Sequence, residues 1–331
     1  MHDSKKSTIR LSFKYTNKFR GRAVPIWLRV AFFGRAIVLS PLIFIEFRSL
    51  VGKQRSRSRF AQKLVNDIGN STLGSGLDIA NRMICLLKRR KTTEFDKKFE
   101  LTPMVQEISK TVTTDLEEMG FSQVHRFISS AEAGYLFEKI LRMPGYCKFK
   151  GSYLTQKHWL EDLSGGPRFD VDNALVVGLE EFTRISKNPL LLAISRSYLG
   201  CPPLLASMQV WSTRRPQIFD LDVLDESAMA FHCDSDYFGF LKFFLLLTEV
   251  DFNNGPFTFV SKSHRGSRHN VGRMSDSEIV SSGDDLHFGI GRPGDLIIAD
   301  TKGWHKATPP QSGVRTMLQI VYASSLFGPL K

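Results

Sequence analysis

The sequence predicts a mainly antiparallel β fold flanked by helices, and three observations lead to this fold class. From residue 204 onwards, short apolar runs alternate with Gly, Pro, Asn and Asp, which is typical of an all-β sandwich or barrel. Between residues 112 and 200, apolar residues recur at helical spacing, so helices should buttress one sheet. With 331 residues, of which 42% are hydrophobic, the chain is long enough to bury a full core.

Helical spacing of apolar residues covers three segments, namely residues 114–120, 129–143 and 177–200. The second segment starts with Ser129 and carries Glu132 three residues later, which is the pattern of a helix N-cap. We therefore expect the N-terminal half of this region to supply the helices that cover the sheet.

Strand-like runs follow at residues 206–213, 296–299 and 317–322. The run 296–299 is short and wholly apolar, which predicts a buried strand. The stretch 213–230 is longer than a hairpin needs, and we expect a lid there.

Positive charge is concentrated towards the N-terminus. Residues 1–100 hold 22 Lys or Arg against 7 Asp or Glu, a net charge of +15, whereas the rest of the chain carries −3. Such a segment can bind an anionic membrane surface or nucleic acid, or it can be a solvated arm. We divide the chain into a basic, partly apolar, helical extension over residues 1–111 and a separate domain over residues 112–331.

Residues 23–47 are the most apolar stretch of the extension. Arg29 and Arg35 lie inside it, and each would cost roughly 2.5 to 3.5 kcal/mol at the centre of a bilayer. Pro25 and Pro41 interrupt it further. A spanning helix, an interfacial helix and a helix packed on the core remain three alternatives. A cleavable signal peptide is not indicated, because the stretch starts late and lacks a small-x-small site at its end.

The four cysteines are widely spaced and form no CxxC pair, at Cys85, Cys147, Cys201 and Cys233. This pattern favours a reducing compartment and no zinc cluster. We expect a cytoplasmic protein, peripheral to a membrane if its N-terminal region binds one.

Three residues have the types and spacing of ligands to a single iron. An octahedral Fe(II) that must bind a chelating keto acid and O2 leaves the protein one face, which two imidazoles and one carboxylate fill. His232 and Asp234 stand two residues apart, so near a strand end they point to the same side. His305 follows the buried run 296–299 and is placed to reach back across a sheet. Cys233, between the first two, should point away from the metal and pack.

Arg315 lies ten residues beyond His305, at the head of the run 317–322. We expect this run to pair antiparallel with the strand that carries His305. A guanidinium there can clamp the far carboxylate of a dicarboxylic acid in two-point contact.

Residues 239–265 read GFLKFFLLLTEVDFNNGPFTFVSKSHR, and here the sequence resembles a known family. It is similar to the phytanoyl-CoA dioxygenase family of Fe(II)- and 2-oxoglutarate-dependent oxygenases, which carry a strand of the type LKxFxxLxxVD, then NGP with an aromatic residue, then Ser-His. The resemblance extends upstream through residues 115–140 and 188–213, and so covers about residue 112 to the C-terminus. The matching positions in the signature are Leu241, Lys242, Leu247, Val250, Asp251, Asn254, Gly255, Pro256, Phe257, Ser263 and His264.

The resemblance implies a double-stranded β-helix, a cupin-like jelly roll with the metal at its open end. It also implies Fe(II) held by His232, Asp234 and His305, 2-oxoglutarate as co-substrate bound by Arg315, and O2 as the oxidant, with ascorbate helpful. The expected reaction decarboxylates 2-oxoglutarate to succinate and CO2 and hydroxylates a substrate. Asp234 is present where halogenating relatives have lost the carboxylate, which favours hydroxylation.

The sequence departs from the family pattern at Ser261 and Lys262, where relatives usually have Pro-Gly. His264 belongs to the Ser-His signature, and we expect it to hold a turn rather than the iron. The five other histidines, His2, His125, His158, His269 and His287, have no partners at ligand spacing.

Five further residues are candidates for the walls of the site. On the strand of residues 240–247, Lys242 and Phe244 share a face, so Lys242 either reaches 2-oxoglutarate or an anionic substrate or extends to solvent at a sheet edge. Gln209 is a second candidate for the co-substrate. Trp211, Phe244 and Trp304 are predicted to line the substrate space.

The substrate does not follow from the fold, because one fold serves many substrates. The basic extension favours a lipid-like or otherwise anionic small molecule or acyl substrate, and it equally suits recruitment to an anionic membrane surface. Two alternatives from other classes remain, a catalytically silent jelly-roll binding module and a nucleic-acid-acting oxygenase that uses the basic arm. The basic stretch has few interleaved aromatic residues and no nucleic-acid motif, which argues against the second.

Overall fold

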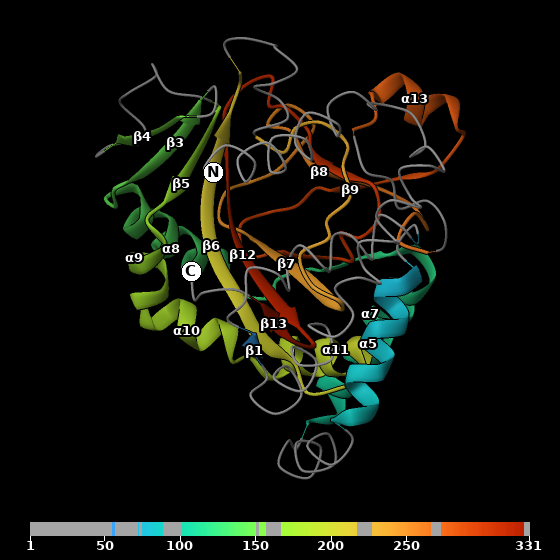
Figure 1. Cartoon of the computed structure of the whole chain (residues 1–331). Coiled ribbons are helices and arrows are strands. Elements are labelled where there is room, and N and C mark those ends of the chain that lie inside the picture. The colour runs from blue at the N-terminus through green and yellow to red at the C-terminus, as the bar shows by residue number, and fades with distance from the viewer. Residues whose placement is uncertain are drawn as a thin grey trace, which may run out of the picture.

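The computed structural model describes residues 55–56, 72, 75–88, 101–149, 152–156, 167–216, 227–265 and 273–327. Two antiparallel sheets face each other, and helices cover the outer face of the larger one (Figure 1). Residues 23–47, the basic run 53–59 except for residues 55–56, and residues 217–226 of the expected lid lie outside the described residues.

The large sheet has eight strands in the order β2-β10-β7-β12-β6-β5-β3-β4. All neighbours in it run antiparallel. Its strands are β2 (Phe121–Val124), β3 (Gly145–Phe149), β4 (Ser152–Gln156), β5 (Arg168–Val171), β6 (Leu204–Arg214), β7 (Phe240–Leu246), β10 (Leu296–Ala299) and β12 (Val314–Ala323).

The small sheet has the order β11-β8-β9 and is likewise antiparallel. An isolated bridge between His232 and His305 adds residues 231–232 to its edge. A separate pair joins β1 (Arg55–Ser56) to β13 (Leu326–Phe327) in parallel. The strands of the small sheet are β8 (Phe257–Val260), β9 (Leu286–Gly289) and β11 (His305–Ala307).

From β6 to β12 the chain passes back and forth between the two sheets. β6, β7, β10 and β12 lie in the large sheet, while residues 231–232, β8, β9 and β11 lie in the small one. This alternation is the topology of a double-stranded β-helix, or jelly roll, as predicted.

Two apolar layers cover the large sheet, one between it and the helices and the other between it and the small sheet. Strand alternation on β7 divides its side chains as predicted, with Phe243 and Leu245 towards the helices and Phe244 and Leu246 towards the small sheet. The inner layer is rich in rings, and Phe244 lies 4.9 Å from Phe257 of β8 between centroids. Burial on both faces explains why β7 is apolar almost throughout.

Helices α7 to α11 pack on the outer face of the large sheet, and α13 lies beside the small one (Figure 1). α8 begins as predicted, because the Ser129 hydroxyl accepts a hydrogen bond from the Glu132 amide at 3.1 Å. α7 runs through the boundary between residues 111 and 112 at which the sequence analysis divides the chain. The helices are α5 (Ser75–Leu87), α7 (Pro103–Met119), α8 (Ser130–Leu141), α9 (Asn173–Gly178), α10 (Glu180–Ser186), α11 (Pro189–Leu199) and α13 (Asp276–Ser281).

One expected strand pairing is wrong. β12 pairs with β6 and β7 in the large sheet and not with β11, which pairs with β8 in the small one. The turn at residues 308–313 therefore carries the chain from one sheet to the other rather than closing a hairpin. Within the described ranges, no helix has both the length and the apolar character that a bilayer span requires.

Candidate metal centre

The backbone places the three predicted ligands side by side. The amides and carbonyls of His232 and His305 bond to each other at 2.9 and 3.0 Å, and the Asp234 amide donates to the Thr301 carbonyl at 2.8 Å. The segment before β7 is therefore fixed against β11 and the turn that precedes it. Residues 73 positions apart in the sequence meet at the edge of the small sheet.

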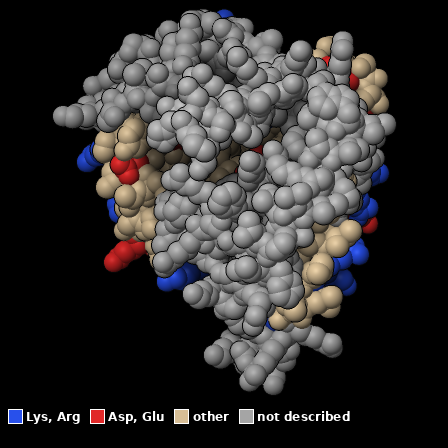
Figure 2. Space-filling view, viewed as in Figure 1, with Lys and Arg blue, Asp and Glu red and all other residues tan. Residues whose placement is uncertain are grey.

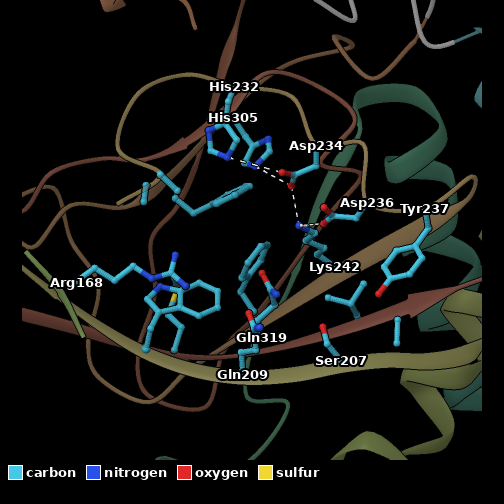
Figure 3. Close-up of a pocket in the computed structure, with 18 of the residues that line it drawn as sticks. Arg168, Ser207, Gln209, His232, Asp234, Asp236, Tyr237, Lys242, His305 and Gln319 are labelled. Atoms are coloured by element: carbon cyan, nitrogen blue, oxygen red, sulfur yellow. Dashed lines mark hydrogen bonds and ion pairs between the residues drawn. The ribbon is translucent and has the colours of Figure 1, made fainter. Parts of the chain in front are cut away.

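The three side chains offer ligand atoms that all lie within 4.8 Å of one another. The Nε2 atom of His305 lies 3.3 Å from Asp234 Oδ2, and that of His232 lies 3.8 Å from Asp234 Oδ1 (Figure 3). The Nδ1 atoms lie 2.9 Å from the carbonyls of Ala230 and Gly303. A donor hydrogen on each Nδ1 satisfies these carbonyls and leaves the Nε2 lone pairs free for a metal.

Two neutral imidazoles and one carboxylate on one face are the donor set of a non-haem Fe(II) centre with open positions. Burial, followed by the neighbouring His305, holds the pKa of His232 well below its ordinary value, so this imidazole is neutral at physiological pH. Burial alone would raise the pKa of Asp234, but Lys242 and His305 outweigh it and keep that carboxyl ionised. The protonation states of His232 and Asp234 are those that a divalent cation needs.

Lys242 points into the site from β7 and is 7% exposed. Its Nζ atom lies 2.7 Å from Asp234 and 2.8 Å from Asp236. Burial works to lower the pKa of this lysine, but the two carboxylates raise it, so it stays charged. The lysine is therefore paired with the carboxylate of a predicted metal ligand and does not extend to solvent at a sheet edge.

A cavity of about 390 Å³ opens between the two sheets beneath the triad. Figure 3 shows the triad along one side, Gln209 and Gln319 on the opposite floor, and Arg168 at one end. The predicted lining residues Gln209, Trp211 and Phe244 all face it.

Trp304 does not line this cavity. It packs instead against Phe231, Val260 and Ile279, and its amide donates to the Ser263 hydroxyl at 2.8 Å. Because successive strand residues point to opposite faces, the neighbour of a ligating His305 has to face away from the metal. Cys233 packs against the same cluster, as expected for a residue between two ligands.

Arg315 is fully buried at the start of β12. It lies on the same face of that strand as Met317 and Gln319, which line the cavity. Its Nη1 atom donates to the Thr308 carbonyl at 3.4 Å, whereas no described residue accepts a hydrogen bond from Nε or Nη2. Burial and the nearby positive charge of Arg168 lower the pKa of Arg315 to about 9. A buried guanidinium without an anion is costly, so this position calls for an anionic ligand.

Arg168 is a site residue that the sequence did not reveal. In register, Thr213 of β6 stands opposite both Arg168 and Arg315, so two guanidiniums flank the same end of the sheet. Arg168 is already neutralised by Asp170, 2.6 Å away, and lies 4.3 Å from the Trp211 ring centroid. No motif marks β5. Gln319, also missed, could have been found from strand alternation two residues beyond Met317.

Two histidines that were not predicted as ligands lie elsewhere, as expected. His264 packs beside Gly120 at the end of α7, where an added Cβ on that glycine would lie 2.4 Å from the imidazole Nδ1. His287 stacks on Phe121 at 5.2 Å between centroids. Within the described ranges, the triad is the one group of three His, Cys, Asp or Glu that is close enough to share a metal.

No protein-family model and no curated protein matches the chain. Solved structures that resemble it include EctD from S. alaskensis (16% identity, TM-score 0.48, covering 67% of this chain and 79% of that one). They also include SnoK, a non-haem alpha ketoglutarate dependent carbocyclase from nogalamycin biosynthesis (19%, 0.47, 66% and 85%). A third is HygX from Streptomyces hygroscopicus with nickel and 2-oxoglutarate bound (17%, 0.44, 68% and 87%). These are distant likenesses of fold.

Proposed function

We propose that the chain is an Fe(II)- and 2-oxoglutarate-dependent oxygenase that hydroxylates a small molecule, with a sequence resembling the phytanoyl-CoA dioxygenase family. One observation carries the proposal. Arg315, a buried guanidinium with no acidic partner among the described residues, lies on the same strand face as Met317 and Gln319, which line a cavity walled by a triad of two histidines and one aspartate. This pairing fits a dicarboxylate that chelates a metal at one end and meets an arginine at the other.

His232, Asp234 and His305 would hold Fe(II), and Arg315 would pair with the far carboxylate of 2-oxoglutarate. The bound metal and co-substrate supply the activation of O2, and the overall reaction turns 2-oxoglutarate, O2 and a C–H bond into succinate, CO2 and an alcohol. The protein's own contribution is orientation and exclusion of water. Buried Trp211, Phe244 and other rings of the inner layer keep the site dry.

Lys242 is assigned a supporting role. Its ammonium contacts one carboxylate oxygen of Asp234 and one of Asp236, and the first contact orients the proposed metal ligand. This role differs from a direct contact with 2-oxoglutarate, the first of the two roles that its sequence position suggests.

The cavity lining favours a polar substrate over an acyl chain. Gln209 and Gln319 stand opposite each other in register on β6 and β12, and both side chains face the cavity near Ser207 and Tyr237. Hydroxyl, amine or amide groups of a substrate can satisfy these carboxamides, whereas a hydrocarbon chain would leave them without partners.

The test is succinate formation from 2-oxoglutarate with Fe(II), ascorbate and O2. We expect wild-type turnover, with loss in His232→Ala and Arg315→Ala, and no change in Arg184→Ala, an exposed arginine on α10 whose side chain pairs with Glu132. Equal succinate from all four proteins would refute the assignment. Iron content after anaerobic purification separates a substrate-gated enzyme, which binds iron, from the alternative of a silent jelly-roll module.

A further inference from the structure

Helix α5 turns an apolar face outward. Four large side chains on it are exposed, with exposed fractions of 60% for Ile79, 51% for Met83, 71% for Leu86 and 56% for Leu87. Their spacing of four, seven and eight residues from the first places them on one stripe along the helix. A contiguous apolar stripe in water marks a surface that binds something.

The opposite face of α5 is docked firmly, so the outward stripe is a fixed feature of the surface. Leu77 and Ile84 are fully buried. The Asn81 amide donates to the Leu199 carbonyl at 3.3 Å, and Asp78 pairs with Lys302 at 2.6 Å. A helix that is apolar on both faces needs cover on both, and within the described part of the chain the core covers only one.

The charges around the stripe are basic. Asp78 is turned towards Lys302, so Arg82 is the charged residue on the outward face. In the sequence, no Asp or Glu occurs between residues 79 and 93, and Arg89, Arg90 and Lys91 follow the helix, whereas Lys88 is buried and its ammonium donates to the Ser324 carbonyl. In Figure 2, Lys and Arg gather along the lower right edge of the view, the side on which Figure 1 places α5.

We propose that the outward face of α5 is a membrane-docking surface that lies on an anionic lipid bilayer. Aliphatic side chains between basic ones are the pattern of an interfacial helix, in which the apolar stripe enters the acyl boundary and the cations meet anionic headgroups. The phosphates of a nucleic acid could pair with the cations, but they offer no apolar surface to cover the four aliphatic side chains. The proposal is independent of the reaction at the metal centre.

The experiment measures co-sedimentation of the full chain with phosphatidylcholine vesicles that contain roughly one third phosphatidylserine. The test variant is the triple substitution Ile79→Gln, Met83→Gln and Leu86→Gln. The matched control is Met104→Gln with Val280→Gln, which are similarly exposed on α7 and α13 at 68% and 71%. We expect the wild type and the control to bind equally and the triple variant to bind at least about tenfold more weakly. Vesicles of pure phosphatidylcholine should bind less of the wild type.

Binding of the triple variant at the wild-type level would overturn the proposal, because the lipid contact would then lie elsewhere in the chain. Failure of the wild type to bind would overturn it as well. A wild-type dimer in light scattering that becomes a monomer in the triple variant would assign the stripe to a protein interface instead. Thermal unfolding checks each variant, and Leu86→Gln with Leu87→Gln is the smaller change to use if the triple variant unfolds.

Discussion

Replacing Arg315 with methionine should stabilise the ligand-free protein while removing its response to 2-oxoglutarate. Most substitutions of a fully buried residue destabilise a protein, so the expected sign is unusual. It follows from the lack of an acidic partner for this guanidinium among the described residues, and from the two of its nitrogens that have no hydrogen bond.

The magnitude follows from the electrostatics of the site. The pKa of Arg315 falls from 12.5 to about 9, which corresponds to about 5 kcal/mol against the charged form. Methionine is shorter than arginine but similar to it in volume, so only a small cavity is left. Replacement of buried ion pairs by apolar groups of similar volume has raised stability by about 1 to 4 kcal/mol. We expect a gain within that range.

The assay is urea unfolding of the metal-loaded protein with Mn(II) in place of iron, with and without 2-oxoglutarate. At a concentration one hundred times its Kd, the ligand should add about 2.7 kcal/mol to the wild type and nothing to Arg315→Met. The control is Arg168→Met, which should not be stabilised because it leaves Asp170 without its partner.

The opposite result would be an Arg315→Met variant that is less stable than the wild type and still gains stability with 2-oxoglutarate. That result would mean that the guanidinium is satisfied within the folded chain and that another residue holds the carboxylate.

Three further predictions test other parts of the structure. Lys242→Met should cost the metal-free protein about 3 kcal/mol in urea unfolding, because it leaves Asp234 without its cation, and Mn(II) should restore much of the loss. Asp295→Ala removes the acceptor for the amides of Arg126 and Arg292 and should cost about 1 to 3 kcal/mol. Burial raises the Asp295 pKa, but hydrogen bonds led by the Arg126 amide hold it below its ordinary value. The stability that the ionised Asp295 carboxylate contributes is therefore present at neutral pH and is lost as the pH falls through its folded-state pKa. The difference in unfolding free energy between wild type and variant should therefore narrow in acid. Gly120→Ala should cost at least about 2 kcal/mol because of its φ of 82° and the nearby His264, while Gly134→Ala in α8, with open space at its Cβ, should be neutral or stabilising.

Much of the fold could be predicted from local patterns. Period-two alternation divided the β7 side chains correctly between the two apolar layers, and the wholly apolar run 296–299 is the buried strand β10. The His-x-Asp spacing correctly placed the side chains of His232 and Asp234 on one side of the chain, beside the backbone bridge between His232 and His305. Such patterns predict correctly those features, such as side-chain direction along a strand, that depend on one short segment alone.

The wrong or missed predictions concern features that depend on contacts between segments far apart in the sequence. The pairing of β12 depends on which sheet the chain enters after residues 308–313, and turn residues do not encode that choice. Arg168 reaches the site only because β5 pairs with β6, a contact that no motif announces. Trp304 is a different case, since the alternation rule applied to His305 would already have turned it away from the cavity.

The metal and co-substrate sites can be measured together by anaerobic calorimetric titration with Fe(II) and then with 2-oxoglutarate. We expect one Fe(II) per chain, bound only while His232, Asp234 and His305 are intact. We also expect one 2-oxoglutarate, which binds after the metal and whose binding is lost in Arg315→Met. Binding of 2-oxoglutarate that needed neither the metal nor Arg315, or Fe(II) binding that survived the loss of His305, would contradict the proposed function.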